Sequence, residues 1–574
     1  MQIDSAFEFT DRGTKVPLKA QLRCADDYTP SSFTISGSTA RSSRIDIGIT
    51  INGLSATVRD GKDSHEAEAP HIFFTVAGYA PAALQEAMMR YWQKHGKPAR
   101  LATLPSGTVE ITDHGTDIFT AGTNRFRLRR YTVQGLVWGV ETLWMDDRNR
   151  LAAVITRDAE FDHFEAVRDD YEPLLGDFIA GAARDASATL EKVSKTMKGR
   201  QTGPLAITGA TLIDGLGNPP ISPATVITVG GKIAAAGPAA SINIPADAKR
   251  VDATGKFIIP GLWDMHAHYE QAEWGPIYLA AGVTTVRDVG NELSFITATR
   301  DAIKTGNGLG PRLLLAGVVD GDGPLALGVQ RVNSAADAAA WVKRYRDAGF
   351  QQIKIYSSLK PEMVKAVCES AHALGMTVTG HIPQGMSVRD GVSAGMDQVN
   401  HIAFVLDSLV SVDLRKATMA ERIDAMRSVD VNSEASRQLI DFLKQHQTVI
   451  DDTGVLYELM TTAADEPAET KEPGIANVAP ELQEQFRGMG SQGDALEYRK
   501  LMWTKALELI GALHKDGGPP GGRNGSGRSR LFCLPGNGDL CGSRFHASGG
   551  AAGSHQYSRA RDGGRFRQRQ RGGG

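Results

Sequence analysis

The sequence predicts an α/β protein whose largest part is a (β/α)8 TIM-type barrel lacking a proper eighth strand. Three observations predict this fold class. Strand-like and helix-like segments alternate from residue 257 onward, seven strands can be counted, and a Gly/Arg-rich tail follows the last helix. Parallel strands joined by helices close into barrels of this kind. A small β-sandwich and an N-terminal β-rich domain are expected before the barrel.

The composition excludes several classes of protein. With 574 residues, the chain is long enough for several domains. A net charge of -3 gives no reason to expect nucleic acid or an acidic membrane as partner. The four cysteines are scattered along the chain, so their spacing predicts neither a disulfide framework nor a zinc site with thiolate ligands. Without a secretory signal or an apolar run of ~20 residues, we expect a cytoplasmic protein that binds a small-molecule substrate.

Residues 1–158 are expected to form a β-rich N-terminal module. Residues 44–51 alternate apolar and polar side chains, and Asn52-Gly53 is a hairpin signal. A helix is expected over Pro81–His95, with Pro81 at a position where its missing N–H does no harm. The histidines here have no ligand-like spacing, so this module carries no predicted catalytic cluster.

Two shorter regions connect this module to the barrel. Residues 159–204 are charged and almost free of proline, which predicts a helical connector followed by a linker. Residues 205–256 contain short strands separated by Gly, Pro and Asn turns, which predicts a small β-sandwich.

The barrel is expected over residues 257–515. Helices such as Ala335–Ala348 and Pro361–Leu374 separate its strands, and glycines follow both helices where C-caps belong. The seven predicted strands are Phe257–Leu262, Thr284–Val289, Arg312–Val318, Gln352–Tyr356, Thr377–Gly380, Gln398–Ile402 and Thr448–Asp452. Catalytic groups of such barrels lie at the carboxyl ends of the strands.

Candidate metal ligands fall at these strand ends. His266 and His268 follow strand one with a spacing that directs both rings to the same side of a strand. Lys354 is a charged residue in the apolar strand four, while His381 and His401 end strands five and six. Each residue alone is more often structural, but together they indicate a site for two cations.

Other polar residues near these strands leave alternatives open. Asp264, Arg287 and Asp288 are either supports for the ligands or an ion pair on the barrel rim. His372 and His446 lie within helices without a partner, and we expect them to be structural.

The motifs that carry these residues resemble the amidohydrolase superfamily, and most of all its imidazolonepropionase-like and prolidase-like branch. They read T-G-K-F-I-I-P-G-L-W-D-M-H-A-H, T-T-V-R-D-V-G, I-K-I-Y, T-G-H-I-P and N-H-I, and the similarity covers about residues 205–515. The resemblance implies that Lys354 is carboxylated by carbon dioxide and bridges two metal ions, usually zinc. His266 and His268 would hold one ion, and His381 and His401 the other.

The same resemblance implies a hydrolase of C–N bonds in amides, cyclic amides or dipeptides, with a hydroxide shared by the metals as nucleophile. Phosphotriester and C–O hydrolysis are near alternatives. The family also needs an aspartate at the end of strand eight for proton transfer, and no residue here is assigned to that catalytic role. A non-enzymatic protein that binds a ligand through the N-terminal module is the alternative from another class.

The tail over residues 516–574 does not supply that strand. It carries ten Arg against three Asp and has no hydrophobic period. A disordered tail or an RNA-binding arm are two interpretations. We favour a third, a frameshift near residues 515–518, because the neighbouring frame of codons 519–525 can encode P-L-V-A-G-T-D. The same offset turns residues 534–553 into two amphipathic pieces. The 574-residue product is then expected to be unstable and at most weakly active.

Overall fold

The computed structural model describes ten stretches of the chain. They are residues 1–39, 44–77, 81–157, 163–196, 203–323, 325–327, 330–470, 473–477, 490–515 and 530–532. Most of the Gly/Arg-rich tail, residues 516–529 and 533–574, lies outside them, and so does the predicted frameshift. None of the helices in these stretches is long and apolar enough to cross a membrane.

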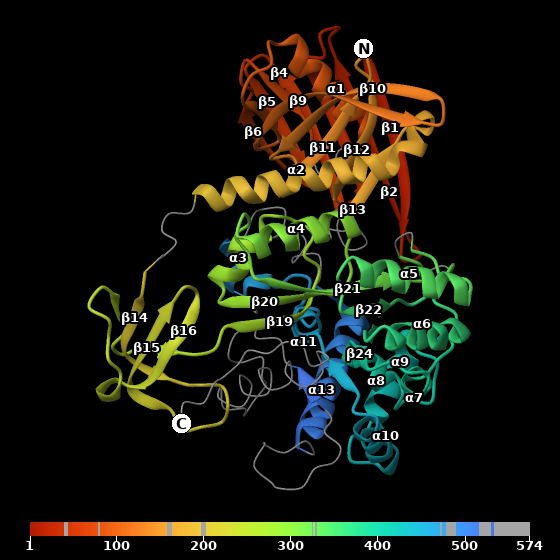
Figure 1. Ribbon diagram of the computed structural model, residues 1–574. Helices are drawn as coiled ribbons and strands as arrows, with labels where there is room; N and C mark the ends of the chain where they lie inside the picture. Colours follow the sequence, from red (N-terminus) through yellow and green to blue (C-terminus); the bar gives the residue numbers. More distant parts are fainter. Residues whose placement is uncertain are drawn as a thin grey trace.

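The N-terminal module consists of two antiparallel-rich sheets (Figure 1). The predicted Asn52-Gly53 hairpin is confirmed, because Asn52 pairs with Ser55 across the turn. The first sheet runs in chain order through β1 (Gln2–Asp11), β2 (Thr14–Cys24), β3 (Pro30–Ser38), β4 (Arg44–Asn52), β5 (Ser55–Asp60) and β6 (Asp63–Glu68). The second contains β7 (Phe73–Thr75), β8 (Leu101–Leu104), β9 (Thr108–Ala121), β10 (Asn124–Gln134), β11 (Val140–Met145), β12 (Leu151–Arg157) and β13 (His163–Val167).

The predicted helix of this module is α1 (Ala82–Lys94), which buries Leu84, Met88 and Trp92 in the core of the module. The predicted connector is helical only in its later part. Its first described residues form β13, which pairs with β12, because Phe164 and Ala166 continue the alternation of a strand. The helix α2 (Leu175–Thr196) follows a short 3-10 turn, η1 (Asp169–Leu174).

A separate five-stranded sheet follows the connector, at the left of Figure 1. It comprises β14 (Leu205–Leu212), β15 (Ile221–Val229), β16 (Lys232–Pro238), β17 (Lys249–Asp252) and β18 (Phe257–Ile258). Among the residues that the structure describes, this sheet has no second layer of strands, so the predicted sandwich is not confirmed. All five strands come from one stretch of chain, which supplies a single layer.

The described residues from Leu262 onward, called the C-terminal part, form eight parallel strands in two curved sheets. One sheet is β19 (Leu262–Ala267), β20 (Val283–Asp288), β21 (Arg312–Val319), β22 (Gln352–Ile355) and β23 (Thr377–Gly380); the other is β24 (Gln398–Asn400), β25 (Val449–Asp451) and β26 (Arg530–Phe532). Strands two to seven thus lie within a few residues of their predicted ranges. The described strands form no single closed sheet, so a complete barrel is not confirmed.

Helices separate these strands in the chain and pack against them. The predicted helices over Ala335–Ala348 and Pro361–Leu374 are α5 (Ala335–Asp347) and α6 (Pro361–Ala373). The others are α3 (Trp274–Ala280), α4 (Leu293–Thr305), α7 (Val388–Ser393), α8 (Ile402–Asp407), α9 (Met419–Ser428), α10 (Glu434–Gln445), α11 (Gly454–Leu459) and α13 (Gly493–Lys515). Buried side chains from strands and helices, among them Leu315, Ile353 and Val399, form one continuous core.

Two predictions about the strands need correction. The predicted first strand, Phe257–Leu262, is split: Phe257 and Ile258 belong to the small sheet, and the first barrel strand starts at Leu262. Pro260 lacks an N–H donor and interrupts the run between them. We also expected no strand after β25, yet Arg530–Phe532 pairs with it in parallel. Cys533 follows this short strand, so no aspartate ends it.

Candidate metal centre

The two histidines of the D-M-H-A-H segment, His266 and His268, lie at the carboxyl end of β19. His266 is near the end of the strand and His268 is one residue beyond it, with ring centroids 5.8 Å apart. Each ring is oriented through Nδ1. His266 contacts Asp451 Oδ2 at 2.8 Å, and His268 Nδ1 donates to the carbonyl oxygen of Gly290 at 2.9 Å.

His381 and His401 face each other across the ends of β23 and β24. Their Nε2 atoms are 3.0 Å apart, and the Nδ1 atoms contact the hydroxyl groups of Ser357 at 2.7 Å and Thr453 at 2.9 Å. The His401 ring lies 4.9 Å from that of His266. The predicted histidines from three separate strands are therefore brought together.

Lys354 is the most deeply buried member of the predicted set, with 1% of its surface exposed on β22. Its Nζ donates a hydrogen bond to Asn400 Oδ1 at 2.6 Å. Burial, which disfavours the ammonium form, lowers the pKa of Lys354 to about 7. A substantial fraction of the amine is therefore uncharged near neutral pH.

Asp451, at the end of β25, was not among the predicted site residues. Its Oδ2 accepts hydrogen bonds from Arg287 Nη2 at 2.8 Å and from Asn400 Nδ2 at 2.7 Å, besides its contact with His266. Burial alone would raise the pKa of Asp451, but His266 and Arg287 outweigh it and hold the pKa below its ordinary value. The signal available in the sequence was its position at a strand end, where the other ligands also lie.

Of the three residues with an open assignment, Arg287 and Asp288 are buried and Asp264 is partly buried, and the ion pair of Arg287 is with Asp451 rather than with either of them. Arg287 is 4% exposed and donates to Met265 O at 2.6 Å as well as to Asp451. Asp288 is fully buried and accepts the backbone N–H of Tyr269 at 2.7 Å. Asp264 accepts the N–H of His266 at 3.1 Å, and burial raises its pKa to about 7.

His372 and His446 lie away from this cluster, as expected. His372 Nε2 contacts Asp397 at 2.9 Å near the end of α6, and His446 contacts the carbonyl of Phe442 at the end of α10. Among the residues that the structure describes, neither ring contacts a predicted ligand.

The N-terminal module also reaches the centre. Arg12, in the turn between β1 and β2, lies with its Nη1 3.5 Å from the hydroxyl of Tyr356. Tyr356 directly follows β22, and its ring centroid is 4.1 Å from that of His381. A side chain from the start of the chain therefore stands beside residues more than 300 positions later.

The donor set suits divalent cations. Burial lowers the pKa of His266 to about 4 and lowers those of His381 and His401 well below the usual value, so these rings are neutral near pH 7 and able to bind metal. Two nitrogens bound to one tetrahedral zinc lie about 3.3 Å apart, close to the 3.0 Å between His381 and His401. Oriented Nδ1 atoms are typical of metal-binding histidines. Within the described stretches, however, no three His, Cys, Asp or Glu side chains already converge on one point.

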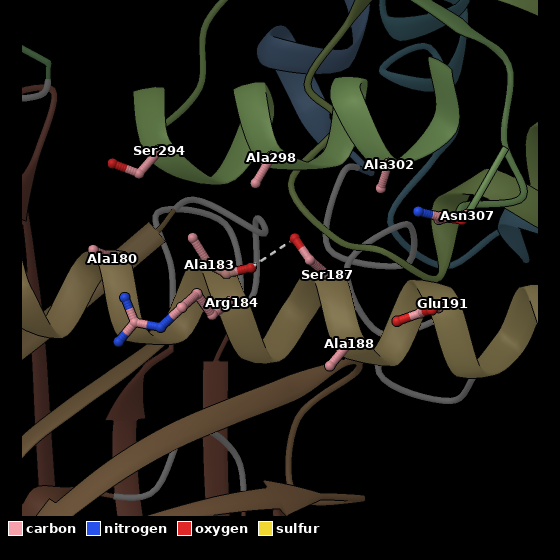
Figure 2. A pocket seen from close by; sticks show the side chains of 10 residues that line it. All are labelled: Ala180, Ala183, Arg184, Ser187, Ala188, Glu191, Ser294, Ala298, Ala302 and Asn307. Carbon is pink, nitrogen blue, oxygen red and sulfur yellow. Dashed lines mark hydrogen bonds between the residues drawn. The ribbon is translucent and has the colours of Figure 1, made fainter. Parts of the chain in front are cut away.

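A hollow of about 520 Å³ lies elsewhere, between α2 and α4 (Figure 2). Small residues such as Ala183, Ala298 and Ala302 line most of it, and Ser187 turns its hydroxyl to the carbonyl of Ala183 at 2.9 Å. None of the predicted metal ligands lines it. It marks the contact of the connector helix α2 with α4 of the C-terminal part.

Comparisons with known proteins give partial matches. No family model matches the chain. An uncharacterized protein of Mycobacterium tuberculosis (Rv2915c) and one of Mycobacterium bovis (Mb2939c) are each 27% identical over 183 residues, 29% of this chain and 50% of theirs. The chain thus spans about half the length of these curated relatives.

Solved structures match a larger part. Bottromycin amidohydrolase is 19% identical, with a TM-score of 0.46 over 66% of this chain and 77% of its own. A Xaa-Pro dipeptidase with bound methionine is 20% identical, with a TM-score of 0.38 over 55% of this chain and 77% of its own. Ochratoxinase of A. niger is 15% identical, with a TM-score of 0.36 over 54% and 74%.

The neighbours are amidohydrolases and peptidases. These are the kinds of protein that the sequence motifs resemble. Because the overlaps are partial and the TM-scores low, function is inferred from the side chains of this site.

Proposed function

We propose that the protein is a metal-dependent hydrolase of C–N bonds in amides, cyclic amides or dipeptides. The observation that carries the proposal is the cluster itself: four histidines with oriented Nδ1 atoms surround a buried lysine at neighbouring strand ends. A structural role would not require four neutral imidazoles to lie close together around an amine.

Each predicted ligand has a proposed part in the site. His266 and His268 would hold one divalent cation, His381 and His401 the second, and Lys354 would bridge both after reaction with carbon dioxide. The uncharged amine is the form that reacts with carbon dioxide, so the lowered pKa of Lys354 favours that modification. Zinc is the expected metal, since imidazole nitrogens suit it. Bound cations would supply Lewis acidity to the scissile carbonyl and to water.

Asp451 is proposed as a positioning residue rather than the proton acceptor. It holds the ring of His266 while Arg287 and Asn400 hold its own carboxylate. A carboxylate whose pKa is held below its usual value is a weak base near neutral pH. The group that passes a proton to the leaving nitrogen therefore stays unassigned in this chain.

The decisive test is metal content together with hydrolysis. We expect nearly two zinc ions per chain, lost in the His266→Ala variant, and release of amine from a panel of dipeptides and cyclic amides by the protein with its reading frame restored. The matched control is His372→Ala, outside the cluster, which should keep its zinc. A zinc-free protein, together with a frame-restored protein that hydrolyses nothing, would exclude the enzyme and favour the alternative, a binding protein that acts through the N-terminal module.

We further propose that activity is impaired by a frameshift near residues 515–518. Two features support this: β26 has three residues, and Cys533 rather than an aspartate follows it directly. A barrel without a full closing strand exposes backbone groups and apolar side chains. If the coding DNA does not read G-T-D in the neighbouring frame, the hypothesis fails. A cooperative melt and ordinary turnover of the 574-residue protein would contradict the predicted impairment.

A further inference from the structure

Two neighbouring strands of the candidate metal centre are each followed by a residue with a left-handed backbone. His401 follows β24 with a φ of 68°, and Thr453 closely follows β25 with a φ of 52°. A positive φ is uncommon for residues other than glycine, and for a β-branched residue such as threonine it is a true outlier. Strain of this kind persists where the surrounding structure enforces it, and it concentrates at functional sites. The contact between these two side chains is therefore of interest.

The helix that follows Thr453 does not explain the threonine. Threonine is common just before a helix because its hydroxyl can accept a hydrogen bond from a backbone N–H of the first turn. Thr453 precedes α11 but makes no such cap, and its φ of 52° and ψ of 38° lie outside the extended region that capping residues adopt. The residue is also 5% exposed, so its hydroxyl does not serve solvation. Its placement is explained instead by its contact with His401.

The hydroxyl group of Thr453 has one hydrogen, and a backbone carbonyl accepts it. Oγ1 donates to the carbonyl oxygen of Asp452 at 2.8 Å, an atom that can only accept. The same Oγ1 lies 2.9 Å from Nδ1 of His401. Because its hydrogen is already donated, Oγ1 must accept at this contact, so Nδ1 of His401 carries a proton. Nε2 of the neutral ring then holds a lone pair, which is the form in which imidazole binds a metal ion.

The neighbouring ring of His381 is held less strictly. Nε2 of His381 lies 3.0 Å from Nε2 of His401, so it donates to the lone pair there. Nδ1 of His381 then accepts from the hydroxyl of Ser357 at 2.7 Å. Among the described residues, this hydroxyl has no acceptor other than His381, so it can reverse its role and accept instead. Ser357 thus permits both tautomers of His381, whereas Thr453 permits one tautomer of His401.

We propose that Thr453 is a positioning residue that fixes the tautomer and the ring orientation of His401 for metal binding. The inference rests on the proposed metal-dependent hydrolase and concerns the cation that His381 and His401 would hold. A metal-binding histidine commonly donates its other ring N–H to an oxygen, which fixes the tautomer. The left-handed backbone of Thr453 directs its hydroxyl between His401 and the carbonyl of Asp452, so the strain is retained for this contact.

The test measures the ring tautomer and the zinc affinity of the full-length protein and its Thr453 variants. Ring-nitrogen NMR of chelated, histidine-labelled protein distinguishes a proton on Nδ1 from one on Nε2, and His401→Asn assigns the signal. We expect the proton on Nδ1 in the wild type and a mixture of tautomers in Thr453→Ala. Competition with a fluorescent chelator should show that Thr453→Ala loses about 10-fold to 100-fold in affinity for one of the two ions. Thr453→Ser keeps the hydroxyl and should retain both properties.

Two further variants separate the lost hydroxyl from a general loss of structure. Alanine is also strained at this φ, so Thr453→Gly is measured beside it, because glycine adopts the left-handed conformation freely. It should show the same loss of zinc affinity. The matched control is Thr448→Ala, at another buried threonine of the same segment, whose hydroxyl has no hydrogen-bond partner among the described residues. It should leave the tautomer and the affinity unchanged.

Several outcomes would overturn the inference. They are a proton on Nε2 of His401 in the wild type, wild-type zinc affinity in both Thr453→Ala and Thr453→Gly, an equal loss in Thr453→Ser, or an equal loss in Thr448→Ala. A protein that binds no zinc, but whose His401 tautomer changes in Thr453→Ala, would overturn the hydrolase function while supporting the positioning of the ring by Thr453.

Discussion

At the scale of single residues, Asp451 connects the predicted ligands to their supports. One carboxylate oxygen contacts His266, Arg287 and Asn400, and Asn400 in turn accepts from Lys354. Asp451, Arg287, Asn400 and Lys354 are all buried, where an unmatched polar group costs about 1–3 kcal/mol. Loss of one member therefore removes a hydrogen bond from each of its partners.

We predict that Asp451→Asn lowers zinc affinity about 10-fold to 100-fold, because His266 loses the carboxylate that orients its ring. Competition with a fluorescent chelator would measure the affinity. The control is Asp397→Asn, which removes a carboxylate from His372 outside the cluster. Equal zinc affinity in the Asp451 variant and the wild type would contradict the positioning role.

The buried histidines also predict how stability depends on pH. Burial lowers the pKa of His266 to about 4, against about 6.5 in an unfolded chain. Between these values the unfolded state binds more protons, so the free energy of unfolding decreases as the pH falls through this window. Urea unfolding of chelated protein at about pH 7 and about pH 5 would measure the difference. His266→Asn should reduce it, whereas equal midpoints at both pH values would refute it.

At the scale of elements, helices pack closely on the parallel strands, and this packing positions the strand ends that carry the predicted ligands. Gly317 on β21 lies directly under the ring of Tyr345 on α5, whose hydroxyl donates to Val318 O at 2.8 Å. An added Cβ at Gly317 would come within 2.3 Å of that ring. The spacing between this helix and the strand beside β22 therefore requires glycine.

We predict that Gly317→Ala lowers the free energy of unfolding by about 1–3 kcal/mol, because the helix must move away from the strand. Denaturant unfolding would measure the change. Gly511→Ala is the matched control in α13, where no atom lies within 4 Å of the added Cβ. That substitution should leave stability unchanged or raise it by about 0.5–1 kcal/mol. Equal stabilities of the two variants would contradict this account.

At the scale of the whole molecule, the N-terminal module packs on the C-terminal part at several points. Arg12 reaches Tyr356, α2 lies along α4, and the ring of Trp138 is 4.6 Å from that of Trp274 (Figure 1). These contacts come from a hairpin turn, a connector helix and a loop. They hold the module over the side of the strands that carries the histidines.

We predict that Trp138→Ala weakens this contact, because an aromatic pair contributes about 0.5–1.5 kcal/mol beyond its buried area. Scanning calorimetry should show the module and the C-terminal part separating into two transitions. Trp341→Ala is the control, since Trp341 packs on Tyr345 within the C-terminal part. A single unshifted transition in the Trp138 variant would show that this contact does not couple the two parts.

Much of the fold could be predicted from local sequence patterns. Periodicity, caps and turn residues act over a few positions, and they predict strands two to seven, α1, α5, α6 and the Asn52-Gly53 hairpin. The candidate ligands could also be predicted, because parallel strands bring their carboxyl ends to one edge. The split of the first strand was missed, since the apolar run continues across Pro260 while its two halves pair with different sheets.

The tertiary structure decided what depends on contacts between distant residues. Asp451 lies 185 positions from His266 and Arg12 lies 344 from Tyr356, and no local period records either approach. The pairing of Arg530–Phe532 with β25 is likewise a long-range contact. From its own residues the chain specifies most strands and the histidines at their ends. That Asp451 orients His266, and that Arg12 lies beside Tyr356, follows only from how the folded parts pack together.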